Sequence, residues 1–228
     1  MTKVTVLVIV SREDMKDDEM VESKSNILYT IGHSNHKIED FIALLNRYEV
    51  TCIADVRSAP YSRYCPQFNK DALGASLRAA GIAYMFLGRE LGARSEDFSC
   101  YESGCVKFQH IAETEEFKGG LKRLIAATTE HQVALMCAEK EPLECHRCIL
   151  VCRHLKGHNL CIRHILQDGR IEDHLDTERR LVKMLKIEPT LFEPSNTERD
   201  LIEQAYDNQA QKISYQPEEL KESYERAE

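Results

Sequence analysis

Short apolar segments alternate with amphipathic ones between residues 27 and 165, and this alternation restricts the fold more than any other feature. The expected strands are apolar and rich in β-formers: residues 27–31, 50–56, 82–87, 132–137 and 159–165. The expected helices repeat apolar residues at helical spacing: residues 37–48, 69–80, 114–130 and 144–156. Such alternation favours a mainly parallel sheet with helices on both faces, a three-layer, Rossmann-like α/β fold.

The two ends of the chain differ from this middle part. Residues 1–26 are mostly polar, and their apolar run at 4–10 is too short for an export signal. Residues 172–228 carry 15 acidic and 8 basic side chains, a net charge of −7, and include three prolines. We expect three parts: an N-terminal lead-in (1–26), an α/β domain (27–171) and an acidic, partly helical C-terminal extension (172–228). The extension is expected mostly on the surface, and it is a candidate for packing on the sheet domain or for self-association.

Composition limits the classes of partner. The net charge is −8, but residues 27–171 carry a net charge of +1, so the acidity lies at the ends. A broad nucleic-acid groove would need a basic face and is not expected, whereas one anion in a pocket is compatible with these charges. No apolar run approaches the ~20 residues that span a bilayer. Nine cysteines without an export signal favour a reduced, cytoplasmic protein rather than a disulfide framework.

Each expected strand runs into polar residues. These follow one another along the chain as Gly32-His33-Ser34-Asn35, Asp55-Val56-Arg57-Ser58, Leu87-Gly88-Arg89-Glu90, Cys137-Ala138-Glu139 and Arg163-His164. In a parallel α/β sheet the carboxyl ends of the strands share one edge, and ligands bind in the crevice there. We therefore expect these distant segments to form a single polar site.

The second of these segments predicts an anion contact. Asp55 and Arg57 lie on the same side of an extended chain, where the carboxylate stays ionised and the guanidinium can grip an anionic group. Arg63 follows in the next loop and is a second candidate. The alternative for the first two residues is a buried ion pair that only fixes the strand end.

Cysteine, histidine, glutamate and arginine are densest between residues 137 and 148. Cys145 is expected in the first turn of a helix, where the helix dipole and Arg147 lower a thiol pKa, as a nucleophile requires. Glu139 is a candidate general acid or base, since it follows a buried strand. His146 and His33 are candidate proton carriers.

Other interpretations of these cysteines stay open. Cys137, Cys145, His146 and Cys148 include the ligand types of zinc, although their spacing is not that of a usual zinc finger. Cys137 and Cys145 could instead form a redox pair, and Cys148 and Cys152 fit a helix core face. No G-x-G-x-x-G fingerprint or phosphate-binding loop is present, so the sequence gives no positive indication that NAD or ATP binds. The cofactor is unknown.

Several of these motifs, in this order, resemble the domain of unknown function family 488 over about residues 27–171. They are Thr30-Ile31-Gly32-His33-Ser34, Asp55-Val56-Arg57-Ser58-x-Pro60, Ser62-Arg63, Phe68-Asn69, Leu87-Gly88-x-x-Leu91-Gly92, Cys137-Ala138-Glu139, Cys145-His146-Arg147 and His164-Ile165. The resemblance implies a compact α/β domain with one shared polar site, and it implies no reaction.

These observations predict an enzyme-like protein that acts on an anionic small molecule, a nucleotide or a nucleic-acid end. If it is an enzyme, it is a cysteine-dependent hydrolase or transferase. The expected catalytic residues are Cys145, Glu139, Cys137, Asp55 and His33, and the expected substrate contacts are Arg57, Arg63, Arg147, Ser34, His146 and His164. The alternative is a non-catalytic ligand- or metal-binding module.

Overall fold

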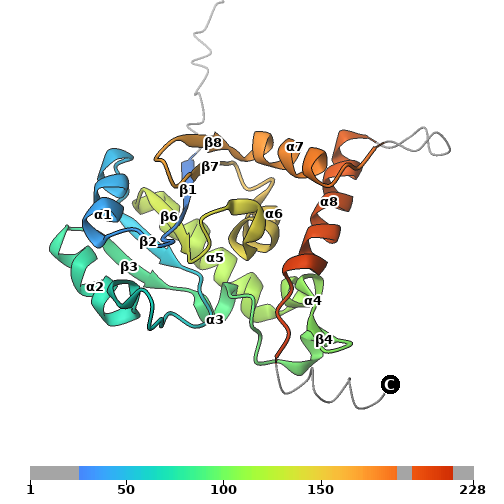
Figure 1. Ribbon diagram of the computed structural model, residues 1–228, viewed down its shortest axis with the longest axis horizontal. Helices are drawn as coiled ribbons and strands as arrows, with labels where there is room; N and C mark the ends of the chain where they lie inside the picture. Colours follow the sequence, from blue (N-terminus) through green and yellow to red (C-terminus); the bar gives the residue numbers. More distant parts are fainter. Residues whose placement is uncertain (1–25, 189–196, 218–228) are drawn as a thin grey trace, which may run out of the picture.

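The computed structural model describes residues 26–188 and 197–217, and its core is a six-stranded sheet (Figure 1). The strands run in the order β3-β2-β6-β1-β7-β8. They comprise β1 (Asn26–Gly32), β2 (Cys52–Asp55), β3 (Ala83–Phe86), β6 (Val133–Cys137), β7 (Leu160–Ile165) and β8 (Ile171–Asp173). The first five strands in that order are parallel, and β8 pairs antiparallel with β7. The predicted mainly parallel α/β sheet is therefore confirmed.

Helices cover both faces of the sheet. One face carries α1 (Ile38–Arg47) and α2 (Lys70–Ala79), and the other carries α5 (Glu115–Glu130), the π-helical segment η4 (Arg147–Cys152), α6 (Arg153–Leu155), α7 (His174–Met184) and α8 (Glu198–Ile213). Strand residues alternate between the two cores: Ala134 and Met136 pack with α1 and α2, whereas Leu135 and Cys137 pack with α5 and η4. This alternation is the period-two pattern of a sheet buried on both sides.

Two connections are more ordered than expected. Residues 88–107, predicted as a loop, contain α3 (Gly88–Leu91), the 3-10 turn η2 (Phe98–Cys100) and a small hairpin, β4 (Tyr101–Glu102) with β5 (Cys105–Val106). The short helix α4 (Phe108–Glu113) follows. The helix predicted over 144–156 forms over residues 146–155, with the π-helical segment η4 followed directly by α6, and the 3-10 turn η3 (Pro142–Glu144) precedes it. A further 3-10 turn, η1 (Pro66–Phe68), precedes α2.

Of the arrangements expected for the C-terminal extension, its helices show packing on the sheet domain, with deeper burial than a mostly exposed extension would have. Leu181 of α7 and Ile202, Ala205 and Tyr206 of α8 are buried in the same core as β6 and η4. Apolar residues at helical spacing explain this, because α8 buries one stripe against η4 while its other side stays polar. Residues 171–173 belong to the sheet itself, as β8. Self-association through the extension stays a prediction, and residues 1–25 lie outside the described residues.

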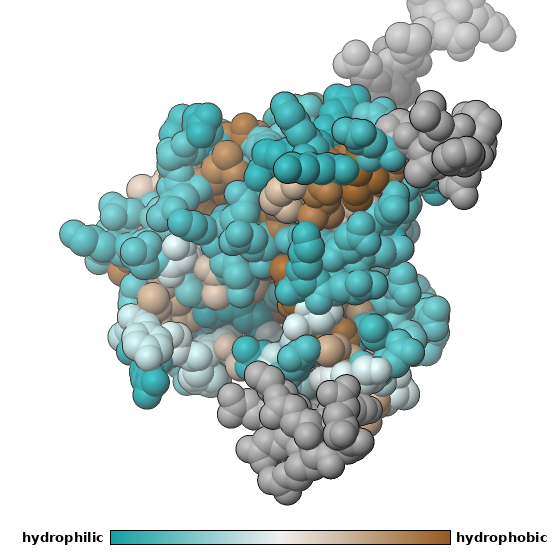
Figure 2. Space-filling view, turned by 45° about the vertical axis from the view of Figure 1, so that its right-hand side comes forward, coloured by the Kyte–Doolittle hydropathy of each residue, from teal (hydrophilic) through white to brown (hydrophobic). Residues whose placement is uncertain are grey.

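The described surface is mostly hydrophilic in the view of Figure 2, where hydrophobic residues show only in gaps between hydrophilic ones. Within residues 26–188 and 197–217, no helix is long and apolar enough to cross a membrane.

Burial of α8 predicts a clear stability difference between two aliphatic truncations. Ile202 is 4% exposed and Leu175 is 47% exposed. Ile202→Ala is expected to lower the free energy of unfolding by about 2–5 kcal/mol, since it leaves a cavity in the core. Leu175→Ala is the matched control and should change it by less than about 1 kcal/mol. Urea denaturation measures both, and equal effects would contradict the packing of α8 into the core.

Candidate functional site

The site lies where the connections of neighbouring strands diverge. Strands β1 and β2 lead into α1 and α2 on one face, whereas β6, which lies between them, leads into η3 and η4 on the other. Such a switch point opens a crevice at the carboxyl ends of the strands. A Cβ on Gly32 would lie 1.9 Å from the carbonyl oxygen of Glu139, so only glycine lets the ends of β1 and β6 approach this closely.

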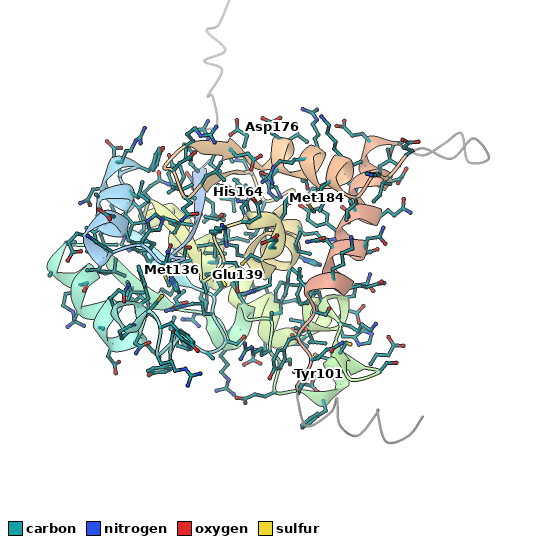
Figure 3. The ribbon with its side chains drawn as sticks, in the orientation of Figure 1. Tyr101, Met136, Glu139, His164, Asp176 and Met184 are labelled. Carbon is teal, nitrogen blue, oxygen red and sulfur yellow. The ribbon has the colours of Figure 1, made fainter. Side chains whose placement is uncertain are left out.

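A cavity of about 360 Å³ occupies this edge. Its lining comes from the segments after β2, α3 and β6 and from the chain just after α8: Arg57, Ser58, Ala59, Ala93, Arg94, Cys137, Ala138, Glu139, Glu144, His146, Ile213, Ser214, Tyr215 and Gln216. Glu139 lies near the middle of the molecule in Figure 3, between the sheet and α8. The cavity therefore joins parts of the sequence that are up to 159 residues apart, from Arg57 to Gln216.

His146 presents one fixed nitrogen to the sulfur of Cys137. Its Nε2 lies 2.9 Å from the carbonyl oxygen of Val56, which can only accept, so Nε2 carries the hydrogen. In neutral His146 the Nδ1 lone pair then faces the Cys137 Sγ at 3.7 Å. Burial alone would lower the pKa of His146, but the neighbouring Cys145 raises it. His146 is thus held in one orientation and is easily protonated.

Cys145 holds its sulfur as a helix-capping group. It is extended (φ −135°, ψ 136°), its carbonyl accepts the N–H of Ile149 at 3.1 Å, and its Sγ accepts the N–H of Arg147 at 3.4 Å. It therefore precedes the helical segment rather than lying in its first turn, as the sequence had suggested. Burial opposes ionisation, yet the hydrogen bond from Cys137 and the charge of Arg147 lower the pKa of Cys145 well below its usual value.

The pKa values of Cys137 and Glu139 are raised, whereas that of Cys145 is lowered. Burial, together with the hydrogen bond and charge of Cys145, raises the pKa of Cys137 well above its usual value. The Glu139 side chain is exposed as a whole, but its Oε2 lies 3.1 Å from the Cys145 Sγ. Desolvation and the charge of Cys145 raise the pKa of this carboxyl. Cys145 Sγ donates to Glu139 Oε2, and the pKa values of the two groups approach each other, so the contact is suited to proton transfer from the thiol to the carboxylate.

Arg147 supports the site from behind and does not face the cavity. Its side chain is fully buried, and its guanidinium donates to the carbonyl oxygens of Glu139 at 2.6 Å and Lys140 at 3.2 Å. Its Nε donates to the Thr30 hydroxyl at 3.4 Å. The prediction that this arginine contacts substrate is not what the geometry supports, because its donors hold the loop after β6.

A buried hydrogen-bonded chain continues from Thr30 to α8. The Glu178 carboxylate can only accept, so the Tyr206 hydroxyl donates to it at 2.8 Å and accepts from His174 Nε2 at 3.2 Å. His174 Nδ1 then accepts from His164 Nε2 at 2.9 Å, and His164 Nδ1 accepts from Thr30 Oγ1 at 2.7 Å. His164 is thus a fully buried structural residue between β1 and α7, and it does not line the cavity.

Asp55, Arg57 and His33 form a second buried group on the cavity edge. Arg57 donates from Nε and NH2 to both Asp55 oxygens, at 2.9 and 2.7 Å, and Tyr84 donates to the same carboxylate at 2.7 Å. Arg57 NH1 lies 3.1 Å from His33 Nε2, so this nitrogen accepts, and His33 Nδ1 donates to the Ser34 carbonyl oxygen at 2.9 Å. Burial and the charge of Arg57 lower the pKa of His33 to about 4. The neutral ring of His33 accepts a hydrogen bond from Arg57 and orients it.

The predicted residues separate into two sets. Cys137, Glu139, His146 and Arg57 line the cavity, with Cys145, Asp55 and His33 in contact with them. Arg63 is exposed and donates to Tyr64, and Ser34 contacts Asn35, so neither is among the lining residues. Ser58 belongs to a segment that the sequence placed at the site, although no contact was assigned to it. Sequence reasoning gave no role to Arg94, Glu144 and Tyr215, and the Leu91-Gly92 motif beside Arg94 is the signal that could have pointed to that arginine.

Within the described part of the chain, two groups of side chains have the ligand types and distances that a metal ion requires. The ligand atoms of Cys137, Glu139, Cys145 and His146 lie within 4.8 Å of one another, at the cavity. The second group is Cys148, His164 and His174, which is buried behind η4. In the second group both histidines are already hydrogen bonded on both nitrogens, so the first group is the better candidate.

Comparison with known proteins finds one family. The family model described as Domain of unknown function DUF488 matches residues 37–153, which is just over half of the chain. This span holds Arg57, Arg94, Cys137, Glu139 and His146, but not the lining residues after α8. No curated protein and no solved structure matches the chain.

The close approach at Gly32 predicts a large effect from one methyl group. Gly32→Ala is expected to lower the free energy of unfolding by about 3 kcal/mol, because the Cβ collides with the backbone of Glu139. Gly74→Ala in α2 is the matched control: no atom lies within 4 Å of its Cβ, and it should stabilise the chain by about 0.5–1 kcal/mol. Thermal denaturation measures both, and a neutral Gly32→Ala would refute this packing.

The neutral histidines predict a loss of stability in acid. Burial lowers the pKa of His174 to about 4, against about 6.5 when unfolded, while Glu178 and Lys156 act on it in opposite directions. Below pH 6.5 the unfolded chain therefore binds a proton that the folded chain does not. This group alone should cost about 2 kcal/mol between pH 7 and pH 5.

The pH dependence is measured as urea stability of the wild type and of His174→Gln at both pH values. The variant is expected to be less stable at pH 7, because it loses two hydrogen bonds, but to lose less stability on acidification. Identical losses in the two chains would show that His174 does not titrate as described.

Proposed function

We propose that this chain, which belongs to the family described as Domain of unknown function DUF488, is an enzyme whose cysteine acts on an anionic ligand in the cavity. The ligand class is a small molecule, a nucleotide or a nucleic-acid end. The reaction class is hydrolysis or group transfer through a covalent cysteine intermediate. The rest of the proposal assigns a role to each side chain.

One observation carries this proposal: an acidic thiol lies in contact with a carboxyl group of raised pKa. Cys145 Sγ is 3.1 Å from Glu139 Oε2, and the two pKa values change in opposite directions. The pKa of the thiol falls and that of the carboxyl rises, so the two values approach each other, and the proton that Cys145 Sγ donates to Glu139 Oε2 can pass to the carboxylate. Titratable groups with perturbed pKa values in contact with each other are typical of active sites. Cys145 then supplies the thiolate, and Glu139 supplies the proton.

The proposed reaction has two steps. In the first, the Cys145 thiolate forms a bond to the electrophilic atom of the ligand, and the departing group takes the proton of Glu139. In the second, water or an acceptor attacks the same atom, its proton returns to Glu139, and the bond to Cys145 Sγ breaks. Hydrolysis and transfer differ only in the attacking group. His146 and Cys137 stabilise the charge on Cys145 throughout.

A second candidate function is metal binding, and the fixed tautomer of His146 favours it. A metal-bound histidine usually donates its other N–H to an oxygen, as His146 does to Val56. Its Nδ1 faces the sulfur of Cys137, and Cys145 and Glu139 complete a group of four. Two thiolates, one imidazole and one carboxylate suit zinc. In that case the pair of sulfurs binds the ion and is not a nucleophile.

Elemental analysis and pH-resolved alkylation distinguish the two functions. The enzyme proposal predicts less than about 0.1 metal ion per chain and a Cys145 labelling midpoint well below the usual thiol pKa of about 8.5. Cys65, a half-buried loop thiol, is the reference on the same chain. Comparing midpoints rather than rates removes the effect of the low exposure of Cys145, which is 1%.

Two controls and one contrary outcome complete this experiment. Cys145→Ser should abolish the low-pH labelling phase, and Cys152→Ser, at a buried cysteine that ends η4, should leave it unchanged. One zinc ion per chain, with Cys137 and Cys145 protected until a chelator is added, would establish the metal site and remove Cys145 as nucleophile.

A further inference from the structure

One wall of the cavity comes from the chain after α8, outside the span that matches the family. The N–H of Val106 in β5 donates to the Tyr215 carbonyl oxygen at 3.0 Å, and Gln216 Nε2 donates to the Cys105 Sγ at 2.8 Å. Figure 1 shows this segment passing α4 on its way to the β4–β5 hairpin. The segment is fastened at two adjacent residues, so Tyr215 has a defined place in the cavity wall.

Arg94 is fixed against that wall. Its backbone N–H donates to Ser58 Oγ at 3.0 Å, and its guanidinium carbon lies 4.5 Å from the centre of the Tyr215 ring. Among the described residues no carboxylate forms an ion pair with it, and its side chain is exposed. A guanidinium stacked on an aromatic ring keeps its N–H edges available for an oxyanion.

The other arginines of the site have few donors left. Arg147 is fully buried and holds the carbonyl oxygens of Glu139 and Lys140. Arg57 uses four of its five side-chain N–H groups, two on Asp55, one on the Phe68 carbonyl oxygen and one on His33. One side-chain N–H group of Arg57 therefore remains for a ligand, whereas the whole guanidinium of Arg94 is available.

The remaining lining residues restrict the charge and shape of the ligand. Glu144 also lines the cavity, and the proposed Cys145 thiolate lies against Glu139 at its edge, so a ligand with several negative charges is repelled. The apolar lining includes Ala59, Ala93, Ala138, Ile213 and the ring of Tyr215. A cavity of about 360 Å³ accommodates a small organic molecule rather than a polymer segment.

We propose that Arg94, held by Tyr215, is the residue that binds the anionic group of the ligand, and that the ligand is a compact, singly charged carboxylate with an apolar body. The carboxylate meets the fork of Arg94 and the one open N–H of Arg57, and the body packs on Ile213 and Tyr215. This inference rests on the proposed anionic ligand and narrows it. The C-terminal segment then determines ligand specificity.

The test is an NMR titration of the ¹⁵N-labelled full chain with four probes: acetate, benzoate, inorganic phosphate and ADP. Benzoate is expected to bind more tightly than acetate, because it adds an apolar body to the same carboxylate, and ADP is expected to bind most weakly. Arg94→Gln should raise the benzoate Kd about 10- to 100-fold, the loss expected for a charge-assisted bidentate contact.

Matched variants separate specific from general effects. Arg89→Gln removes an exposed arginine outside the cavity lining, paired with Glu116, and should leave the Kd unchanged. Tyr215→Ala should raise the benzoate Kd more than the acetate Kd, since it removes apolar surface as well as the support of Arg94. Amide spectra of the free variants verify the fold before each titration.

Three outcomes overturn this inference in distinguishable ways. If Arg94→Gln binds benzoate as tightly as the wild type, Arg94 is not the anion contact, and the proposed anionic ligand survives. If ADP binds better than benzoate, the ligand class is wrong. If none of the four probes shifts any resonance of Arg94, Ser58 or Tyr215, the proposed anionic ligand fails together with this inference.

Discussion

The charge of Arg147 is completely removed from water, and the site is organised around it. A buried guanidinium is tolerated only where hydrogen bonds and a negative charge compensate for its lost hydration. Backbone oxygens of Glu139 and Lys140 supply the hydrogen bonds, and these fix the loop after β6. The charge of Arg147 in turn lowers the pKa of the Cys145 thiol, and the proposed Cys145 thiolate would supply the negative charge. The same interaction therefore shapes the cavity edge and stabilises its thiolate.

The C-terminal helices belong to this arrangement. From the Nε of Arg147, hydrogen bonds pass through Thr30, His164 and His174 to Tyr206 of α8, and the Glu178 carboxylate at the far end sets their direction. Each buried polar group on this path has a partner, which is the condition under which a polar network is compatible with a core. The α/β sheet and the extension thus share one interior, although their charges differ.

Prediction from sequence succeeded where a local pattern was sufficient. Apolar runs and helical periodicity indicated the five parallel strands, and the polar residues at their ends indicated the edge that holds the cavity. It failed where a residue's role depends on a distant partner. The sequence suggests that Arg147 contacts a ligand, but in the structure its N–H groups donate to the carbonyl oxygens of Glu139 and Lys140. It suggests that His164 ends a strand at the site, but in the structure this histidine is hydrogen bonded to Thr30 and His174.

The amino-acid sequence by itself determined the fold class, the family and the convergence of Cys137, Glu139 and His146, because strand period, helix period and motif order are local properties of the chain. Only the tertiary structure decided that α8 is part of the core and that Arg94 and Tyr215 meet at the cavity. The Arg94–Tyr215 contact joins residues 121 positions apart, and the hydrogen bond from Gln209 of α8 to Leu143 of η3 joins residues 66 positions apart. Their formation depends on how the extension packs against η4 and the β4–β5 hairpin, and no local pattern encodes that packing.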